Sequence, residues 1–213
     1  MKAFIYTGGK IDPAFITEHP KGDDIVIAAD SGYQNALALG EKPRLVLGDF
    51  DSLKEDKFPE DVECIRVPAE KDFTDTQLAV DTALKRGATE IIIIGGLDGR
   101  LDHTLSNLAI LEDLSKKNIH AHITNGYNRA RYIESTSTLI ARSGFKYLSL
   151  LCLSEKAKGV SVEGCKYPLK NARLERSFQF AVSNEISGNC ALISVRKGGI
   201  YIIESRDACV HLL

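Results

Sequence analysis

Two aspartates separated by one residue follow a short apolar run in "LVLGDFDSL", at Asp49 and Asp51. Apolar runs also lead to acids in "IVIAAD" at Asp30 and in "IIIIGGLD" at Asp98. Carboxylates at such positions suit Mg²⁺, a hard cation that proteins usually hold with one or two carboxylates and substrate phosphates. Asp, Ser and Gly are also common turn residues, so "GDFDS" alone fits a plain polar turn as well.

Two further segments, "EKDFTD" and "GRLDH", add acids and cations that could meet phosphate. Their charged or titratable residues include Lys71, Asp72, Asp75, Arg100, Asp102 and His103. Each has a structural alternative, because acids near helix starts also cap helices and surface cations are commonly only solvated. Glycine pairs recur nearby, but no G-x-G-x-x-G or Walker pattern is present, so neither a standard dinucleotide site nor a P-loop is supported.

Strand and helix signals alternate over the first part of the chain. "EIIIIGG" is typical of a strand buried in a parallel sheet, and "TDTQLAVDTALKRG" of a helix that starts with a Thr74/Gln77 capping box and stops at Gly87. The alternation predicts a Rossmann-like, mostly parallel α/β domain over residues 1–133. Ligands collect beyond the carboxyl ends of such strands, so the acids are expected to share one rim.

Short β-type runs replace the helical periodicity from about Ile133 onwards. They are "STLIAR", "KYLSLLCL", "GVSVEG", "FQFAVSN", "CALISV" and "GIYIIES", with Gly, Asn and Ser between them. This pattern predicts a second domain over residues 134–213, an antiparallel sandwich or barrel.

The composition limits the function classes. Of 213 residues, 44% are hydrophobic and 26% charged, and the net charge is −2, which gives no electrostatic case for binding nucleic acid or an anionic membrane. Five cysteines, an odd number and without a C-x-x-C pair, predict a reducing cytoplasm. "MKAFIYTGGK" is too quickly polar for a signal peptide, and no apolar run approaches the roughly 20 residues of a membrane span.

Four motifs taken together resemble the thiamine pyrophosphokinase family over nearly the whole chain. They are "LGDFDSL", "EKDFTDTQLA", "GGLDGRLDHTLSNL" and "SNEISG", and their order and spacing make the resemblance specific. The family implies an α/β nucleotide-binding domain followed by a β-sandwich. It also implies a homodimer, with sites where the nucleotide domain of one subunit meets the sandwich of the other. The implied reaction moves pyrophosphate from ATP to the thiamine hydroxyl, giving thiamine diphosphate and AMP.

The resemblance also implies roles for individual residues of the first domain. It assigns Mg²⁺ to Asp49, Asp51 and Asp75. It implies that the same pocket is lined by Lys71, Asp72 and Thr74. It implies that Arg100, Asp102 and His103 face the ATP phosphates. Asp30 matches the acid of a "DGG" motif that reads Asp30-Ser31-Gly32 here. Asp72 and Asp102 are the candidates for a base that accepts the thiamine proton.

On the second domain the resemblance assigns thiamine contacts to Ser183 and Asn184. Animal members of the family stack the thiamine pyrimidine on a tryptophan, and this chain has no Trp. Tyr167 occupies the corresponding place in "GCKYPL", where its ring can still stack on a heteroaromatic ring. The alternative for Tyr167 is a partly buried structural tyrosine.

Two other functions fit parts of the sequence. "LVLGDFDSL" also resembles the D-x-D-x-[ST] motif of phosphohydrolases in which the first Asp, here Asp49, attacks phosphorus. That motif usually lies on the first strand, and this reading leaves the β domain with "SNE" unexplained. A non-catalytic nucleotide or thiamine sensor is the second alternative. A sensor has no need for so many carboxylates held together.

Overall fold

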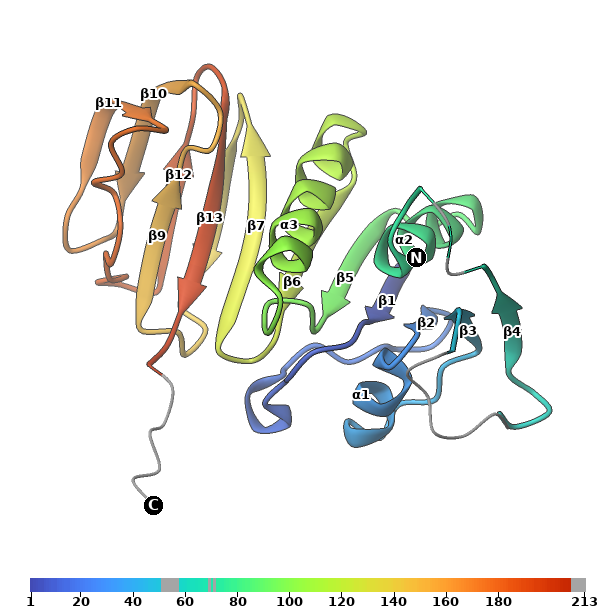
Figure 1. Cartoon of the computed structure of the whole chain (residues 1–213). Coiled ribbons are helices and arrows are strands. Elements are labelled where there is room, and N and C mark those ends of the chain that lie inside the picture. Colours follow the sequence, from blue (N-terminus) through green and yellow to red (C-terminus); the bar gives the residue numbers. More distant parts are fainter. Residues whose placement is uncertain (51–57, 69, 71, 208–213) are drawn as a thin grey trace. The chain divides into compact units, whose positions relative to one another are not determined.

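The computed structural model describes residues 1–50, 58–68, 70 and 72–207. The chain divides into two compact units, Met1–Gly126 and Tyr127–Leu213 (Figure 1). The second unit therefore starts earlier than the 133/134 boundary expected from the sequence. Strand β7 (Asn128–Glu134) belongs to it, because β7 pairs antiparallel with β13 (Gly199–Ser205) over its whole length.

A parallel sheet forms the centre of the first unit, as the sequence predicts. Its strands have the order β4-β3-β2-β1-β5-β6. Their bounds are β1 Lys2–Tyr6, β2 Ile25–Ala29, β3 Leu45–Gly48, β4 Glu63–Arg66, β5 Glu90–Ile94 and β6 His120–Thr124. Every neighbouring pair is parallel, and Ile5 of β1 lies beside Ile27 of β2 and Ile93 of β5. Strands β1, β2, β3 and β5 consist mainly of buried apolar residues because both faces of the sheet are covered there, whereas the edge strand β4 is largely exposed.

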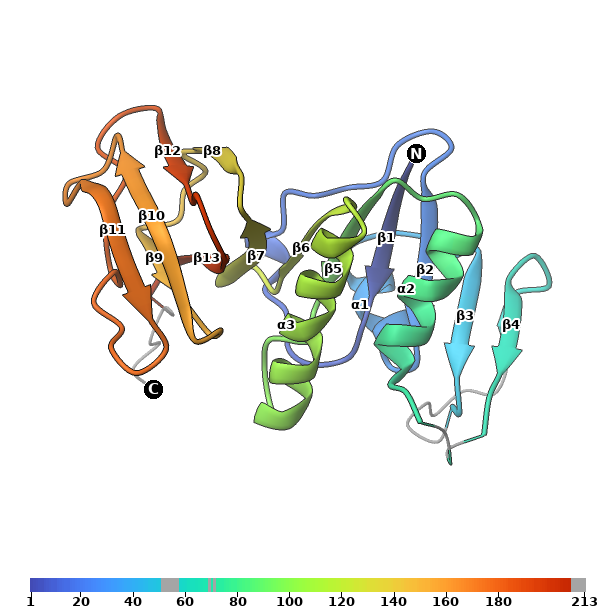
Figure 2. The same ribbon diagram turned by 90° about the horizontal axis from the view of Figure 1, so that it is seen from above.

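Helices cover both faces of this sheet (Figure 2). They are α1 Gly32–Ala38, α2 Asp75–Lys85 and α3 Leu101–Lys116, and a short 3-10 helix, η1 Pro13–Phe15, has no buried residue. Ala36 of α1 packs into one cluster with alternate sheet residues such as Phe4 and Val46. Figure 2 shows α2 and α3 side by side on the other face. The order of the strands changes direction at β1, so the carboxyl ends of β1, β2 and β5 flank the point where ligands collect in open α/β sheets.

Helix α2 starts where the sequence predicts. The hydroxyl of Thr74 accepts the Gln77 N–H at 3.2 Å, which satisfies one of the unpaired amides of the first turn. The predicted capping box is only half formed, because the Gln77 side chain donates to Asp81 instead of returning to Thr74. This cap holds the start of α2 at the carboxyl ends of the strands.

We expect Thr74→Ala to lower the free energy of unfolding by about 1 kcal/mol, the usual cost of a lost cap. Urea denaturation measures this directly. Thr82→Ala, inside the same helix, is the matched control, because alanine is the best helix former. Equal effects of the two substitutions would contradict the capping role of Thr74.

The second unit consists of two antiparallel sheets that share one apolar core. One has the order β7-β13-β9 and the other β11-β10-β12-β8. The remaining bounds are β8 Ser137–Ala141, β9 Tyr147–Leu151, β10 Lys156–Glu163, β11 Leu169–Glu175 and β12 Cys190–Ser194. Ile202 and Leu150 of the first sheet pack in one cluster with Ile140 and Ile193 of the second.

The segment "FQFAVSN" does not form the regular strand that the sequence predicts. Its bridges to neighbouring segments are isolated, Glu175 with Phe178 and Leu148 with Asn184, and between them the Ala181 carbonyl accepts the Leu150 N–H at 2.7 Å. A left-handed backbone at Ser183, with φ of 57°, interrupts the extended conformation that a longer ladder requires.

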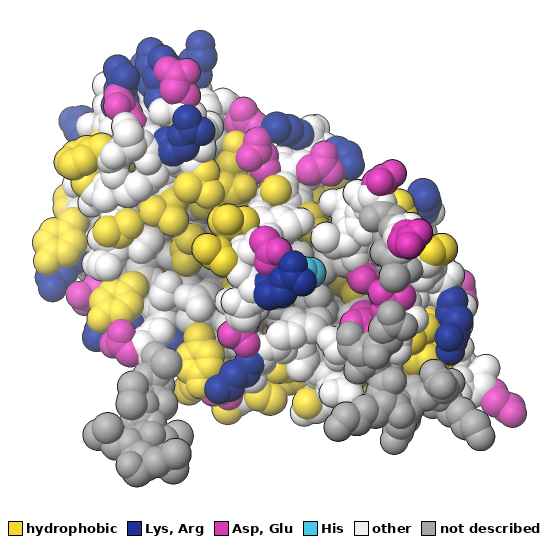
Figure 3. All heavy atoms as spheres, viewed as in Figure 1, with side chains coloured by type: hydrophobic (Ala, Val, Ile, Leu, Met, Phe, Trp, Pro, Cys, Tyr) yellow, Lys and Arg dark blue, Asp and Glu magenta, His cyan; other side chains and the backbone are white. Residues whose placement is uncertain are grey.

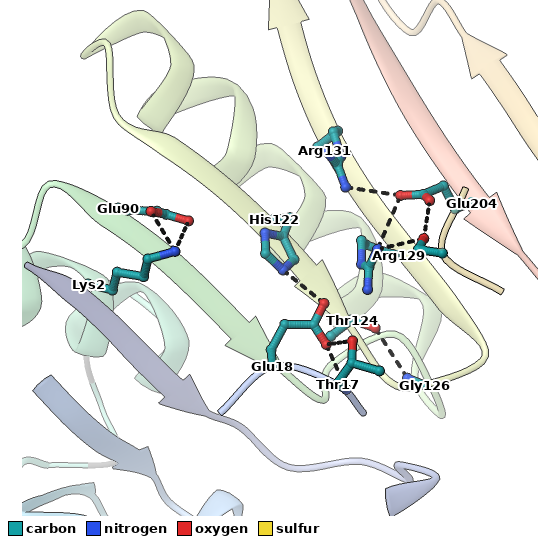
Figure 4. Close-up of polar contacts among 11 residues, drawn as sticks. Lys2, Thr17, Glu18, Glu90, His122, Thr124, Gly126, Arg129, Arg131 and Glu204 are labelled. Carbon is teal, nitrogen blue, oxygen red and sulfur yellow. Dashed lines mark hydrogen bonds and ion pairs between the residues drawn. The ribbon is translucent and has the colours of Figure 1, made fainter. Parts of the chain in front are cut away.

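A buried charge cluster lies at the end of the second unit's first sheet (Figure 4). Glu204 is 2% exposed, and its carboxylate lies 2.9 Å from the Arg131 guanidinium and 3.6 Å from that of Arg129. The Ser143 hydroxyl donates to the same carboxylate at 3.0 Å. Burial of Glu204 is tolerable because its oxygens are paired and hydrogen-bonded.

Across the described ranges, no helix has both the length and the apolar character needed to cross a membrane.

Candidate functional site

Acidic residues follow the carboxyl ends of two neighbouring strands of the first unit. Asp30 follows β2, and Asp49 follows the adjacent β3. The Asp30 N–H donates to Leu47 O at 2.8 Å, which holds the two strand ends together. Gly48 permits this approach, because a β-carbon there would lie 3.2 Å from the Asp30 α-carbon and its φ is +149°. Asp30 is itself left-handed, with φ of 47°.

The side chain of Asp30 has one oxygen, Oδ1, that is buried and without a hydrogen-bond partner among the described residues. A buried carboxylate oxygen without a partner is costly unless a cation or donor reaches it. Phe50 follows Asp49 and is 5% exposed, with its ring packed 5.3 Å from that of Phe58. This anchor fixes the backbone on one side of the half-buried Asp49.

Helix α2 brings Asp75 to the same rim. Asp75 is its first residue, and the next residue, Thr76, shares a buried hydroxyl–hydroxyl hydrogen bond of 3.1 Å with Thr7 at the end of β1. Asp51 and Lys71 lie outside the described residues. Over the ranges that the structure covers, no group of three or more His, Cys, Asp or Glu could hold a metal ion. The Asp49, Asp51 and Asp75 set therefore stays a prediction.

A hollow of about 390 Å³ lies beside the start of α2. Its lining consists of Asp72, Phe73, Thr74, Gln77 and Ser106. Asp72 and Thr74, both predicted site residues, thus share one concave surface, and the exposed Phe73 adds an apolar wall. Ser106 comes from α3, so the hollow joins the starts of two helices.

Arg100 and Asp102 form an ion pair at the protein surface. Arg100 Nε lies 3.1 Å from Asp102 Oδ1, and Nη2 lies 2.6 Å from Oδ2. The hydrogen bonds from Arg100 hold the pKa of the Asp102 carboxyl below its usual range, and the same pair raises the pKa of Arg100. His103 follows, exposed, and its N–H also donates to Asp102. Both partners are largely exposed, so the pair can open at little cost.

Two short backbone segments, which we call the glycine loops, lie at the ends of the neighbouring strands β1 and β5. They are Gly8–Gly9 and Gly95–Gly96. The Gly96 N–H donates to Gly8 O at 2.9 Å, so the loops are joined. Gly96 has φ of +69°, and a β-carbon there would lie 2.5 Å from Asn107 Nδ2. Glycine backbone at this end of a sheet can approach a phosphate closely.

The second unit carries a small, mainly apolar pocket of about 90 Å³. Its lining consists of Leu148, Leu150, Val162, Tyr167, Leu169, Phe180, Ala181, Val182 and Asn184. Figure 3 shows hydrophobic side chains, in yellow, reaching the surface between charged ones. Tyr167 is 58% exposed, so more than half of its surface is open to a ligand.

Asn184 holds Tyr167 in place through its side chain. Asn184 Oδ1 accepts the Tyr167 N–H at 2.9 Å, and Nδ2 donates to Tyr167 O at 2.7 Å. Oδ1 also accepts the Glu185 N–H at 2.9 Å. Ser183 is exposed, and its N–H donates to Ser149 Oγ at 3.0 Å. The predicted contacts Tyr167, Ser183 and Asn184 therefore lie together, with Asn184 mainly supporting Tyr167.

Comparison with known proteins identifies the family of the chain. A model of the thiamin pyrophosphokinase catalytic domain matches residues 18–123, and one of the thiamin pyrophosphokinase vitamin B1 binding domain matches residues 136–200. The thiamine pyrophosphokinase of Bacillus subtilis (strain 168) is 32% identical over 186 residues, which are 85% of this chain and 87% of that protein. The chain belongs to the thiamin pyrophosphokinase family.

The resemblance carried by the four motifs is thus confirmed. Thiamin pyrophosphokinase 1 of Caenorhabditis elegans is 25% identical over 190 residues, 84% of this chain and 78% of that protein. Among solved thiamin pyrophosphokinases, the Bacillus subtilis structure has a TM-score of 0.86 at 27% identity, covering 98% of this chain and 100% of that one. The Geobacillus thermodenitrificans structure has a TM-score of 0.85 at 27% identity, covering 98% and 99%.

Some residues of these sites were not expected from the sequence. Phe180 and Val182 line the second-unit pocket, although the pattern of "FQFAVSN" predicts only a strand. The alternation of apolar residues in that segment is the one signal that pointed to an apolar surface. Asn35 and Asn107 contact the glycine loops, and no local sequence pattern marks either.

Proposed function

We propose that this chain is a Mg²⁺-dependent thiamine pyrophosphokinase that transfers pyrophosphate from ATP to the thiamine hydroxyl, giving thiamine diphosphate and AMP. The observation that carries this proposal is the match of both the catalytic and the vitamin B1 binding domain, in order, within one chain. The acid-lined rim of the first unit and the aromatic pocket of the second supply sites with the chemistry of the two substrates.

The donor set at the rim suits Mg²⁺. Carboxylate oxygens are its preferred protein ligands, and the buried Oδ1 of Asp30, which has no hydrogen-bond partner among the described residues, supports a cation or donor at this rim. We propose Asp49, Asp51 and Asp75 as the residues that hold the ion, with Asp30 beside them. When bound, Mg²⁺ would neutralise phosphate charge and stabilise the AMP leaving group.

The chain's own cations would complete this neutralisation. Lys71 and Arg100 are proposed to bind the ATP phosphates, with Thr74 and His103 lining the same site. We propose that Arg100 turns from Asp102 toward the phosphates when ATP binds. Once Arg100 leaves, the pKa of Asp102 returns from its lowered value toward the ordinary carboxyl value, because the guanidinium no longer favours the ionised form. Asp102 then becomes a better acceptor for a proton.

The proposed transfer is an in-line displacement. The thiamine hydroxyl oxygen forms a bond to the β-phosphorus of ATP, and the bond from that phosphorus to the oxygen bridging it to the α-phosphate breaks. The hydroxyl proton passes to Asp72 or Asp102 or to solvent, and AMP departs with the bonding electron pair. Such chemistry depends on positioning and charge stabilisation more than on a protein nucleophile.

The acceptor site is proposed to lie at the second-unit pocket. The exposed ring of Tyr167 offers a face for the thiamine pyrimidine, and Ser183 provides a hydroxyl beside it. The two hydrogen bonds between Asn184 and the Tyr167 backbone would keep this ring in place.

Three further features belong to the proposal. The first unit is proposed to be Rossmann-like and the second a β-sandwich, supported by the strand order and by the core shared between the two antiparallel sheets.

A homodimer is proposed, with the nucleotide unit of one subunit facing the thiamine unit of the other, and light scattering would give its mass. A cytoplasmic location is supported by the odd number of cysteines.

A turnover assay tests the function. Purified protein is mixed with ATP and Mg²⁺, with and without thiamine, and AMP, phosphate and thiamine diphosphate are quantified. AMP that forms only with thiamine, in equal amount to thiamine diphosphate, supports the proposal. Phosphate release without thiamine would favour the aspartyl-nucleophile hydrolase. Binding without turnover would favour the sensor.

We expect Tyr167→Ala to raise the KM for thiamine by about tenfold while the KM for ATP changes less than about twofold, because loss of a stacked aromatic ring removes about 1.5 kcal/mol. Tyr147→Ala, another partly exposed tyrosine of the same unit, is the control. An unchanged thiamine KM in Tyr167→Ala would remove Tyr167 from the site.

A further inference from the structure

Two asparagines from different helices reach the glycine loops. Asn35 of α1 donates from Nδ2 to Thr7 O at 2.8 Å and to Gly9 O at 3.0 Å. Asn107 of α3 donates from Nδ2 to Gly96 O at 3.0 Å. Their partners are carbonyl oxygens, which only accept hydrogen bonds, so the amide nitrogen of each asparagine must face its loop.

These contacts engage the carbonyl oxygens of the first loop, and Gly96 O of the second, with donors inside the protein. Thr7 O and Gly9 O bind Asn35, and Gly8 O, between them, binds the Gly96 N–H at 2.9 Å. A carbonyl oxygen carries partial negative charge and would repel a phosphate placed at the carboxyl end of β1. Engaging these oxygens inside the protein therefore favours an anion at this position.

The same contacts set the direction of the neighbouring N–H groups. In a trans peptide the C=O and the following N–H point in opposite directions, and the described peptides of both loops are trans. Holding Thr7 O toward Asn35 turns the Gly8 N–H away from α1. Holding Gly96 O toward Asn107 likewise turns the Leu97 N–H away from α3.

The peptide that joins Gly9 to Lys10 shows this orientation of the N–H group. Asn35 holds Gly9 O, and the N–H of the following residue, Lys10, donates to the Asp98 carboxylate at 2.9 Å. An anionic oxygen thus binds the face of the peptide opposite to the asparagine. The burial of the two asparagines also fits a position behind the loops. Asn107 is 4% exposed and Asn35 is half-buried.

We propose that Asn35 and Asn107 are positioning residues for nucleotide binding. They orient the peptide groups of the two glycine loops so that N–H groups, and not carbonyl oxygens, face the phosphates. This inference rests on the proposed function, because it names ATP as the anion. Neither asparagine touches the nucleotide. Each acts through the backbone that it holds.

The experiment measures binding of a non-hydrolysable ATP analogue with Mg²⁺ by calorimetry, together with KM values for both substrates. Asn35→Leu removes the donor at nearly the same size, and Asn35→Asp replaces it with an acceptor. We expect both to weaken nucleotide binding about tenfold, the effect of losing roughly 1.4 kcal/mol, with the thiamine KM within about twofold of wild type. Asn35→Gln keeps the amide donor and is expected to bind the nucleotide more tightly than Asn35→Leu.

Matched variants separate positioning from other effects. Gln34→Glu makes the same charge change one residue away on the exposed side of α1, and nucleotide binding there should stay near wild type. Asn107→Leu tests the second loop, and if it fails to fold, the Asn35 series decides. If the wild-type protein binds the ATP analogue and both Asn35→Leu and Asn35→Asp bind it equally well, this inference is overturned and the proposed function stands. A wild-type chain that binds no ATP analogue would overturn the proposed function and the inference together.

Discussion

Asp49→Asn is expected to lower turnover by about 100-fold or more while the protein remains folded. The change removes a negative charge at the carboxyl end of β3, beside Asp30, where we propose that the ion and the phosphates bind. Loss of one preorganised electrostatic contact at a reacting centre typically costs a factor of about 100 to 1,000 in rate. The side chain keeps its shape, so its packing beside the buried Phe50 is retained.

Two measurements accompany this variant. A Mg²⁺ titration should show that half-maximal activity needs a higher ion concentration than in wild type. A thermal melt should show a midpoint close to wild type. Asp23→Asn is the matched control, since Asp23 is exposed and precedes β2, at the opposite end of the strand from Asp30. Near-normal turnover of Asp49→Asn at saturating Mg²⁺ would contradict the metal assignment.

Glu204→Ala is expected to lower the free energy of unfolding by about 3 kcal/mol, the lower end of the range for breaking a buried ion pair. The carboxylate is 2% exposed, and its removal leaves Arg129, which is 8% exposed, without the anion that offsets its desolvation. It also leaves the Ser143 hydroxyl without its acceptor. Urea denaturation with the slope compared between variants measures the change.

Glu134→Ala is the control for this prediction. Glu134 is exposed on β7, the strand that also carries Arg129 and Arg131, and surface substitutions of this kind usually change stability by less than about 0.5 kcal/mol. Glu204→Gln keeps the size and an acceptor oxygen, so it should fall between the alanine variant and wild type. Equal stability of Glu204→Ala and Glu134→Ala would show that the charge cluster adds no net stability.

The parallel sheet and its helices could be predicted from local chemistry. "EIIIIGG" is apolar on both faces because helices cover both faces of β5, and Thr74 marks the start of α2 because its hydroxyl meets an unpaired amide. The second unit was less predictable. Asn128–Glu134 and Leu169–Glu175 form strands despite polar or charged sequences, since pairing with neighbouring strands outweighs local propensity.

The candidate site also has features that could be predicted from the sequence and features that could not. The residues that carry charge could be named from their types and their positions after apolar runs. Their partners could not. The Arg100–Asp102 pair, the support of Tyr167 by Asn184 and the two asparagines behind the glycine loops depend on side-chain directions. Asn35 and Thr7 are far apart in sequence, and no local pattern records that α1 folds back onto the end of β1.

By itself the sequence determined the α/β class of the first unit and the family, and it predicts the acids of the rim. It could do so because strand and helix periodicity are local properties, and because four ordered motifs are unlikely to coincide by chance. Only the tertiary structure decided which groups meet: Asp30 against Gly48, Thr7 against Thr76, and the glycine loops against two asparagines. The physical reason is that hydrogen bonds and burial depend on distances through space, and the packing of helices on the sheet sets those distances.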